Sequence, residues 1–144
     1  MKYTTKAEYG IAAIADIAIH SAEGEKVTTA EIAHRQHISP KYLEQILIQL
    51  RQANLIRAAK GQKGGYSLIH PPSEIRITAV LNALDSSILA DAAESDDESG
   101  LRRNIKGCLW DKLNGAMRAY TDRMTLAELI EQGICADETG SYVI

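Results

Sequence analysis

The chain has 144 residues, of which 45% are hydrophobic and 24% charged, and its formal net charge is −3. This composition fits a globular protein with one domain, or with a small domain and an appendage. No apolar run approaches the roughly 18 residues that a membrane span needs, and no apolar segment follows a basic one in MKYTTKAEYG, so we expect a cytoplasmic protein without a membrane partner. Cys108 and Cys135 are too few for a disulfide framework or a four-sulfur metal site.

The net charge conceals a difference between the two halves. Residues 1–76 carry 10 Lys and Arg against 7 Asp and Glu, whereas residues 77–144 carry 6 against 12. The basic first half is compatible with a polyanionic partner. We therefore expect the halves to have different roles.

Residues 5–20 are apolar almost all round, with Glu8 and Asp16 as interruptions. A helix with this pattern is packed between other elements. A second helix is expected from Thr28 to near Gln36, because Thr28-x-x-Glu31 forms a capping box. Val27 and Ile32 would form its hydrophobic staple.

A third helix is expected to begin at Ser39 and Pro40, which suit the cap and the first helical position. Its apolar face is formed by Leu43, Ile46, Leu47 and Leu50, and its outer face carries Lys41, Tyr42, Glu44, Gln45, Gln49 and Gln52. Two helices joined by a tight turn, the second rich in amides, predict a helix-turn-helix whose second helix enters the major groove. Such a pair also occurs as inert packing.

The segments LIRAA (55–59) and YSLI (66–69) are predicted strands that bracket AKGQKGG. A hairpin directly after a recognition helix is a wing, and its tip would lie along the DNA backbone or minor groove. The expected tip residues are Lys60, Gly61, Gln62, Lys63, Gly64 and Gly65. Taken alone, the same stretch could be a glycine-rich turn with solvated lysines.

The second half begins with a helix whose apolar residues are Ile77, Val80, Leu81 and Leu84, followed by an acidic stretch that we expect to be a flexible linker. A long helix of roughly 36 Å is expected from Leu101 to Met124. Its heptad-like stripe comprises Trp110, Leu113, Met117, Tyr120 and Met124, and a second stripe comprises Leu101, Ile105 and Leu109. One stripe would pack on the chain itself and the other on a partner, although a single-domain core could absorb both. Thr125-x-x-Glu128 then caps a short last helix.

The expected fold is mainly α with a small β-hairpin wing. It comprises a winged helix-turn-helix domain (1–84), the linker (85–100), a dimerisation helix with a short capping helix (101–132) and a C-terminal tail (133–144). No catalytic motif or convergent set of polar groups is evident, so we do not expect an enzyme. A winged domain that binds protein rather than DNA remains the alternative.

MKYTTKAEYG, ISPKYLEQILIQLRQANLIRAAKGQKGGYSL, LWDKL and MTLAEL together resemble the Rrf-two-type winged-helix regulators typified by IscR, NsrR and CymR. The resemblance covers nearly the whole chain and implies a homodimeric bacterial transcription factor that binds a palindromic double-stranded operator. By position in these motifs, DNA contacts fall to Ser39, Lys41, Tyr42, Glu44, Gln45 and the tip residues 60–65, and backbone anchoring to Thr4, Thr5 and Lys6. Glu44 could equally be a solvated surface residue, because a carboxylate at DNA is useful only opposite a cytosine amino group.

Several relatives hold an iron–sulfur cluster through three cysteines in the loop before the long helix. This chain has no cysteine there, and Asn104 and Gly107 stand where an IscR-like protein has its last cysteine and histidine. We therefore expect no conventional cluster and no cofactor. The alternative is a redox or iron–sulfur sensor of the IscR or NsrR type with non-standard ligands. Some relatives complete a cluster with an acidic residue from the other subunit, at the position of Glu8, and His34, His37 and Cys108 could supply further ligands.

The final residues Tyr142, Val143 and Ile144 are similar to the tail with which serine acetyltransferases dock into cysteine synthase, and CymR-like repressors also end in isoleucine. Among the relatives, the chain thus resembles CymR-like cysteine metabolism repressors that lack the cluster cysteines. The resemblance implies repression of cysteine and sulfur metabolism genes, with cysteine synthase as a corepressor. A frayed terminus, or an edge strand packed on the partner chain, is the alternative. The sequence leaves open whether Cys108 or Cys135 is redox-active.

Overall fold

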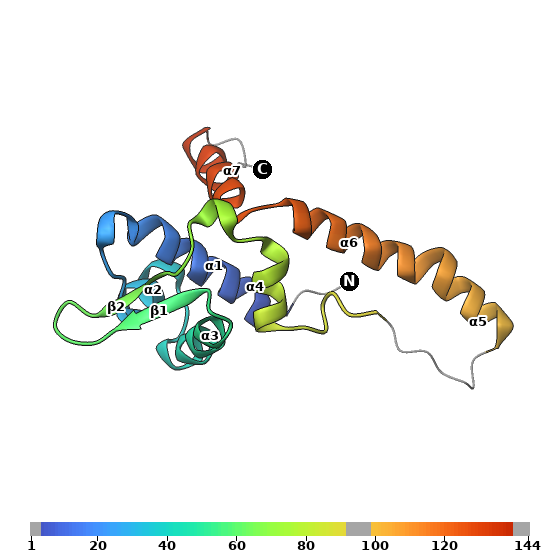
Figure 1. Ribbon diagram of the computed structural model, residues 1–144, viewed down its shortest axis with the longest axis horizontal. Coiled ribbons are helices and arrows are strands. Elements are labelled where there is room, and N and C mark those ends of the chain that lie inside the picture. Colours follow the sequence, from blue (N-terminus) through green and yellow to red (C-terminus); the bar gives the residue numbers. More distant parts are fainter. Residues whose placement is uncertain (1–3, 92–98, 140–144) are drawn as a thin grey trace.

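The computed structural model describes residues 4–91 and 99–139, with side chains described as far as Ile134. Its helices are α1 (Thr5–His20), α2 (Thr29–Gln36), α3 (Pro40–Gln52), α4 (Ile77–Leu84), α5 (Gly100–Ile105), α6 (Asp111–Arg123) and α7 (Leu126–Thr139), and its strands are β1 (Ile56–Ala59) and β2 (Gly65–Leu68). We call residues 4–84 the winged domain and residues 100–123 the arm (Figure 1). Within the described residues, no helix is long and apolar enough to cross a membrane. The fold is mainly α with a two-stranded hairpin, as the sequence predicted.

Helix α1 occupies the centre of the winged domain. It is capped by Thr4, whose side chain accepts a hydrogen bond from the Ala7 backbone N–H at 3.1 Å. It packs against α2, α3, α4 and β2. Ile14 and Ile17 are fully buried, whereas Ile19 near the end of the helix is exposed. The expectation of a helix packed between others is therefore confirmed for all but its last turn.

The helix-turn-helix forms as its capping residues predict. Thr28 and Glu31 make both hydrogen bonds of the capping box, at 3.2 and 3.3 Å. His37 adopts a left-handed conformation (φ 55°) that ends α2 and turns the chain into α3. The apolar face of α3 then points into the core, with Leu43, Ile46, Leu47 and Leu50 fully buried.

The hairpin pairs β1 with β2 in antiparallel register, with Ile56 opposite Leu68 and Ala59 opposite Gly65. Val27 adds a bridge to Tyr66 on the free side of β2. This bridge makes Gly65 necessary, because a Cβ there would lie 2.7 Å from the Val27 carbonyl oxygen and its φ is 144°. The register fixes which hairpin residues face the helices and which face outward.

The arm is one long helical stretch that leaves the winged domain (Figure 1). It includes a π turn at Lys106–Trp110, where the Asp111 backbone N–H donates to the Lys106 carbonyl oxygen. The predicted long helix is thus confirmed, with one irregular turn. The expectation that one stripe packs on the chain itself is wrong for most of the helix, because both stripes are largely exposed on this chain, and packing on a partner stays a prediction. Exposed side chains are Leu101, Ile105, Leu109, Trp110, Leu113 and Tyr120, and only Met117 and Met124 are half-buried.

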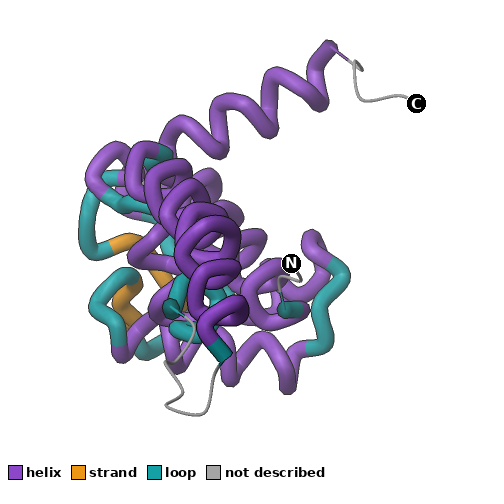
Figure 2. The backbone as a smooth tube through the Cα atoms, turned by 90° about the vertical axis from the view of Figure 1, so that its right-hand side faces the viewer, coloured by secondary structure: helices purple, strands orange, loops and turns teal. Residues whose placement is uncertain are grey.

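Helix α7 returns the chain to the winged domain. The Leu126 backbone N–H donates to the Ile75 carbonyl oxygen at 2.8 Å, and Leu126 is fully buried. Thr125 caps the helix by accepting from the Glu128 N–H at 3.1 Å. Figure 2, which looks along the arm, shows α7 pointing away from it.

Helix α7 is longer than the predicted short helix. It continues to Thr139, because Glu131, Gln132, Ala136 and Glu138 are good helix formers and a single glycine costs only about 1 kcal/mol. The expected tail from residue 133 therefore begins as helix.

Candidate nucleic-acid interface

The outer face of α3 is available for an external partner. Its buried face anchors the helix, so the exposed side chains of Lys41, Glu44 and Gln45 project from a fixed platform. Ser39 is exposed and caps the helix, since its hydroxyl accepts from the Tyr42 N–H at 3.2 Å. Together these side chains provide both hydrogen-bond donors and hydrogen-bond acceptors, which the reading of base edges requires.

Tyr42 differs from the other predicted α3 contacts because it also packs. Its ring lies edge-on to Tyr9 of α1, with centroids 5.9 Å apart and planes at 82°. This geometry is favourable for aromatic pairs. The packed ring therefore helps to orient the start of α3. Because Tyr42 is only half-buried, part of its side chain remains accessible to a partner.

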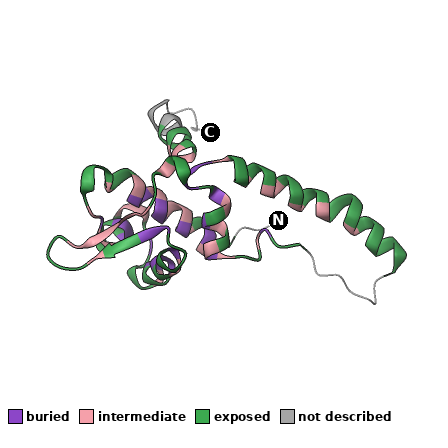
Figure 3. Ribbon diagram, viewed as in Figure 1, coloured by how far each residue is buried: buried purple, intermediate pink, exposed green. Residues whose placement is uncertain are grey.

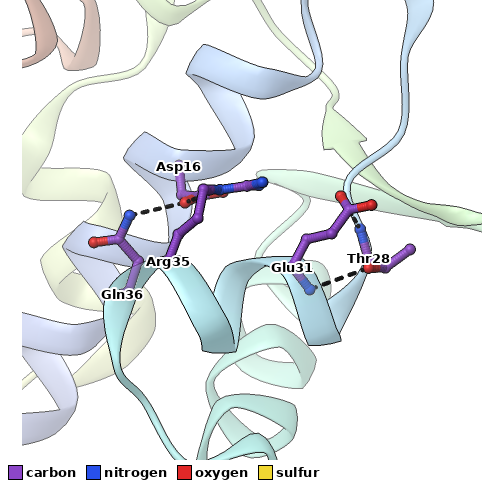
Figure 4. Close-up of polar contacts among 5 residues, drawn as sticks. All are labelled: Asp16, Thr28, Glu31, Arg35 and Gln36. Atoms are coloured by element: carbon purple, nitrogen blue, oxygen red, sulfur yellow. Dashed lines mark hydrogen bonds and ion pairs between the residues drawn. The ribbon is translucent and has the colours of Figure 1, made fainter.

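The position of α2, and with it the whole helix-turn-helix, is fixed by a polar clamp that we define as Asp16, Arg35 and Gln36 (Figure 4). Arg35 donates from Nε and Nη2 to the Asp16 carboxylate at 2.9 and 2.7 Å, and Gln36 Nε2 donates to the same group at 2.8 Å. The Asp16 side chain is 0% exposed. The clamp thus joins α1 to the last turn of α2.

The charge state of the clamp follows from its contacts. Burial alone would raise the pKa of the Asp16 carboxyl, but the hydrogen bonds from Arg35 and Gln36 and the nearby positive charge outweigh burial and hold that pKa below its usual value. Asp16 is therefore ionised at neutral pH. In the sequence Asp16 stands out only as a charged interruption of an apolar helix, and that interruption is the one local signal of the clamp.

The wing tip presents exposed cationic and polar side chains. Lys60, Gln62 and Lys63 are all exposed, and within the described residues neither lysine makes an ion pair. The neighbouring glycines are explained by geometry, since a Cβ on Gly64 would lie 2.5 Å from the Ala59 carbonyl oxygen. The glycines therefore determine the shape of the turn, whereas the two lysine side chains make no ion pair that would stabilise it.

The predicted anchors at the start of α1 lie apart from the wing tip. Thr4 is the α1 cap. The pKa of the Asp85 carboxyl, after α4, is lowered mainly by hydrogen bonds from Ser87 and to a smaller extent by Thr4 and Lys6. In Figure 1 the hairpin tip, α3 and the start of α1 follow one another along the lower side of the domain. The structure thus spreads the predicted DNA residues along one side rather than gathering them in a pocket.

Comparison with known proteins places this geometry among regulators. Residues 3–132 match the sequence model of the family Rrf2, described as an iron-dependent transcriptional regulator. The HTH-type transcriptional regulator IscR of Aliivibrio salmonicida (strain LFI1238) is 37% identical over 133 residues, which cover 90% of this chain and 77% of that protein.

Solved structures show the same fold. CymR, the global cysteine regulator of B. subtilis, matches with a TM-score of 0.78 and 27% identity over 92% of this chain and 98% of its own. T. potens IscR matches with a TM-score of 0.76 and 31% identity, over 92% and 88%. These relatives are named as regulators, in agreement with the expectation that the chain is not an enzyme.

The side chains that could bind iron in this chain do not fit the iron–sulfur cluster that several relatives hold. Such clusters are held mainly by several cysteine thiolates, and the chain has two cysteines. Among the described residues, no three His, Cys, Asp or Glu side chains gather where they could share a metal ion. Cys108 is exposed in the arm, at the other end of the molecule from α2, which carries His34 (Figure 1).

Proposed function

The chain belongs to the Rrf2 family of transcriptional regulators, and on this premise we propose that it acts as a homodimer that binds a palindromic double-stranded DNA operator. The recognition helix is α3, and the wing tip and the start of α1 contact the DNA backbone. The protein works in the cytoplasm, where its operator is. The observation that carries the proposal is the alignment of these three elements along one side of the winged domain (Figure 1).

The roles within this interface follow from chemistry. Gln45 and Lys41 can read base edges in the major groove, whereas Lys60 and Lys63 neutralise phosphates and contribute affinity without sequence preference. Glu44 can accept from a cytosine amino group, which would restrict the operator at one base pair. The remaining proposed contacts are Thr4, Thr5, Lys6, Ser39, Tyr42, Gly61, Gln62, Gly64 and Gly65.

The arm is the proposed dimer interface. Leu101 is 70% exposed, Trp110 51% and Tyr120 59%, an arrangement that exposes large apolar groups to water unless another surface covers them. A groove of about 460 Å³ between α4 and α6 continues this apolar surface, with Leu81, Leu89 and Leu113 in its lining. A second copy packed along the arm would set two α3 helices about one DNA turn apart, roughly 34–36 Å.

We propose cysteine and sulfur metabolism genes as the targets, with the protein as their repressor. The similarity to CymR, named the global cysteine regulator of B. subtilis, and the misfit of the cluster ligands support this choice. In this proposal cysteine synthase is the corepressor and docks Tyr142, Val143 and Ile144. These three residues lie outside the described part of the chain.

The alternative is an IscR-type redox or iron–sulfur sensor with non-standard ligands. Its support is the sequence identity of 37% to the A. salmonicida IscR over 90% of this chain. The two functions share the fold and the DNA surface, so they differ in operator and in effector.

The deciding experiment is selection of genomic DNA fragments by the purified protein, with and without cysteine synthase, followed by sequencing. We expect palindromic sites upstream of sulfur-uptake genes, enriched further by the enzyme, and loss of that enhancement when Ile144 is deleted. Sites near iron–sulfur assembly or stress genes, with no effect of the enzyme, would favour the alternative. Absence of any enrichment would contradict operator binding itself.

A further inference from the structure

A second hollow lies on the opposite side of the hairpin from α3. It has a volume of about 540 Å³ and is formed by the end of α1, the short 3-10 turn Ala22–Gly24, strand β2 and the segment leading to Pro72. In Figure 1, α3 lies below the hairpin and the end of α1 above it. The hollow, which we call the rear cleft, is therefore separate from the proposed DNA surface.

The strand register places cations around a hydroxyl in this cleft. Arg57 on β1 is directly opposite Ser67 on β2, so their side chains share one face of the hairpin. On the other side of β2, Lys26 Nζ donates to Ser67 Oγ at 3.5 Å. Lys26, Ser67 and Arg57 thus form a row across three adjacent backbone segments, and His70 lines the cleft near its end.

The positive charge of this row is not neutralised by the residues that line the cleft. No carboxylate is among them, although Glu23, Glu25 and Glu74 lie on the segments that flank it. Within the described residues, Arg57 makes no ion pair. An exposed guanidinium beside a lysine and a hydroxyl provides the fork of donors that carboxylate and phosphate groups accept.

The cleft also has an apolar part. Ala18, Ala22, Ile69 and Pro72 contribute it, beside Ser21, His70 and the cationic row. A bare inorganic ion would use only the row, whereas a small organic anion could also bury its carbon skeleton against these side chains. We propose that the rear cleft binds a small organic anion, whose carboxylate or phosphate group contacts Lys26, Ser67 and Arg57.

Such a ligand would join the end of α1 to the base of the wing. The wing already contacts this part of the domain through the packing of β2 on α1, the Val27–Tyr66 bridge and the Lys26–Ser67 hydrogen bond, and the ligand would add to these contacts. The site is independent of operator binding, and its test needs no DNA.

The test is an NMR titration of the full ¹⁵N-labelled chain with phenyl phosphate, benzoate and inorganic phosphate in parallel. We expect saturable shifts of the Lys26, Arg57 and Ser67 amides, and weaker binding of inorganic phosphate, which lacks the apolar part. A preference for phenyl phosphate over benzoate would assign a phosphate ligand, and the reverse a carboxylate. Either preference supports the site.

The matched variants are Arg57→Gln and, as control, Arg51→Gln, which removes the same charge from an exposed position on α3. Arg57→Gln should weaken binding about tenfold, as for loss of a charged hydrogen bond, and Arg51→Gln should not change it. Lys26→Gln provides a second variant if Arg57→Gln unfolds. Equal binding by the variants and the natural chain, or shifts spread over all surface lysines and arginines, would overturn the proposal.

Discussion

The winged domain and the arm are both built from amphipathic helices, yet only the winged domain covers its own apolar side chains (Figure 3). In α3, Leu43 and Leu47 are 0% exposed, whereas Leu101 and Leu109 of the arm are 70% and 45% exposed. The same periodicity therefore has two outcomes. In the winged domain, helices from distant parts of the chain meet each apolar face, and in most of the arm no other element of this chain does.

Polar contacts differ between the two regions in the same way. The Asp16–Arg35 pair has one partner fully buried, whereas the Asp111–Lys106 pair of the arm, at 3.0 Å, has its aspartate 41% exposed. Buried pairs are costly to break, and exposed pairs contribute little. The winged domain thus buries its principal ion pair, whereas the arm keeps its ion pair at the surface.

The largest effect expected from this comparison is on folding stability. Replacing Asp16 by alanine leaves Arg35 and Gln36 without their buried partner and should lower the free energy of unfolding by about 3 kcal/mol, the lower end for a broken buried pair because Arg35 can turn toward water. Asp111→Ala should change it by less than about 1 kcal/mol. Urea denaturation followed by circular dichroism measures both. Equal losses in the two variants would contradict the distinction.

Dimerisation should respond to the arm alone. Trp110→Ala removes the largest exposed apolar side chain of the arm and should weaken self-association by about 2 kcal/mol, roughly 30-fold in Kd. Sedimentation equilibrium measures this change.

Ile48→Ala is the matched control for the arm, because Ile48 is 53% exposed on α3, close to the 51% of Trp110. It should leave self-association unchanged. A monomeric natural chain, or a dimer indifferent to Trp110, would remove the proposed role of the arm.

DNA affinity should respond to the winged domain. The double substitution Lys60→Ala and Lys63→Ala removes two phosphate contacts and should weaken operator binding by about tenfold, with the slope of log affinity against log salt reduced by about 2. Fluorescence anisotropy at several salt concentrations measures both quantities. Lys112→Ala on the arm is the control and should leave the slope as it is. An unchanged slope in the double variant would show that the wing does not touch phosphate.

The smallest expected effect is a pH dependence of stability. Since the pKa of Asp16 is lower in the folded chain, its contribution is present above the ordinary aspartate pKa of about 3.9 and is lost as pH falls through the folded value. Unfolding free energies measured between pH 6 and pH 3 should therefore fall less steeply in Asp16→Asn than in the natural chain. Parallel pH curves would show that the clamp does not titrate.

The elements of the winged domain were predictable because their signals are local. Thr28 and Ser39 specify helix starts by accepting hydrogen bonds from the backbone N–H groups of Glu31 and Tyr42, three residues on, and Thr125 does the same for Glu128 at the start of α7. Both predicted strands lie within one residue of β1 and β2. The predicted DNA contacts rest on the same local reasoning and on family resemblance, and they remain proposals.

Other features depended on contacts between distant residues. Asp16 and Arg35 are 19 positions apart, and the rear cleft combines Lys26, Arg57 and His70 from separate segments. Nothing in the sequence near Asp16 indicates which cation will reach it. The length of α7 differs from the prediction for another reason, because the helix continues through Gly133 and the acidic residues that were expected to lie in the tail.

The sequence by itself determined where helices and strands form, because caps, turn residues and apolar periodicity act within a few residues. Only the tertiary structure decided which apolar faces find a partner within the chain. The stripes of the arm and the buried face of α3 look alike in sequence, but α3 meets α1, α2 and α4, whereas nearly all of the arm extends past the elements that could cover it. A face is buried only when helices or strands from other parts of the sequence pack against it. A local pattern therefore specifies an apolar face but not its partner.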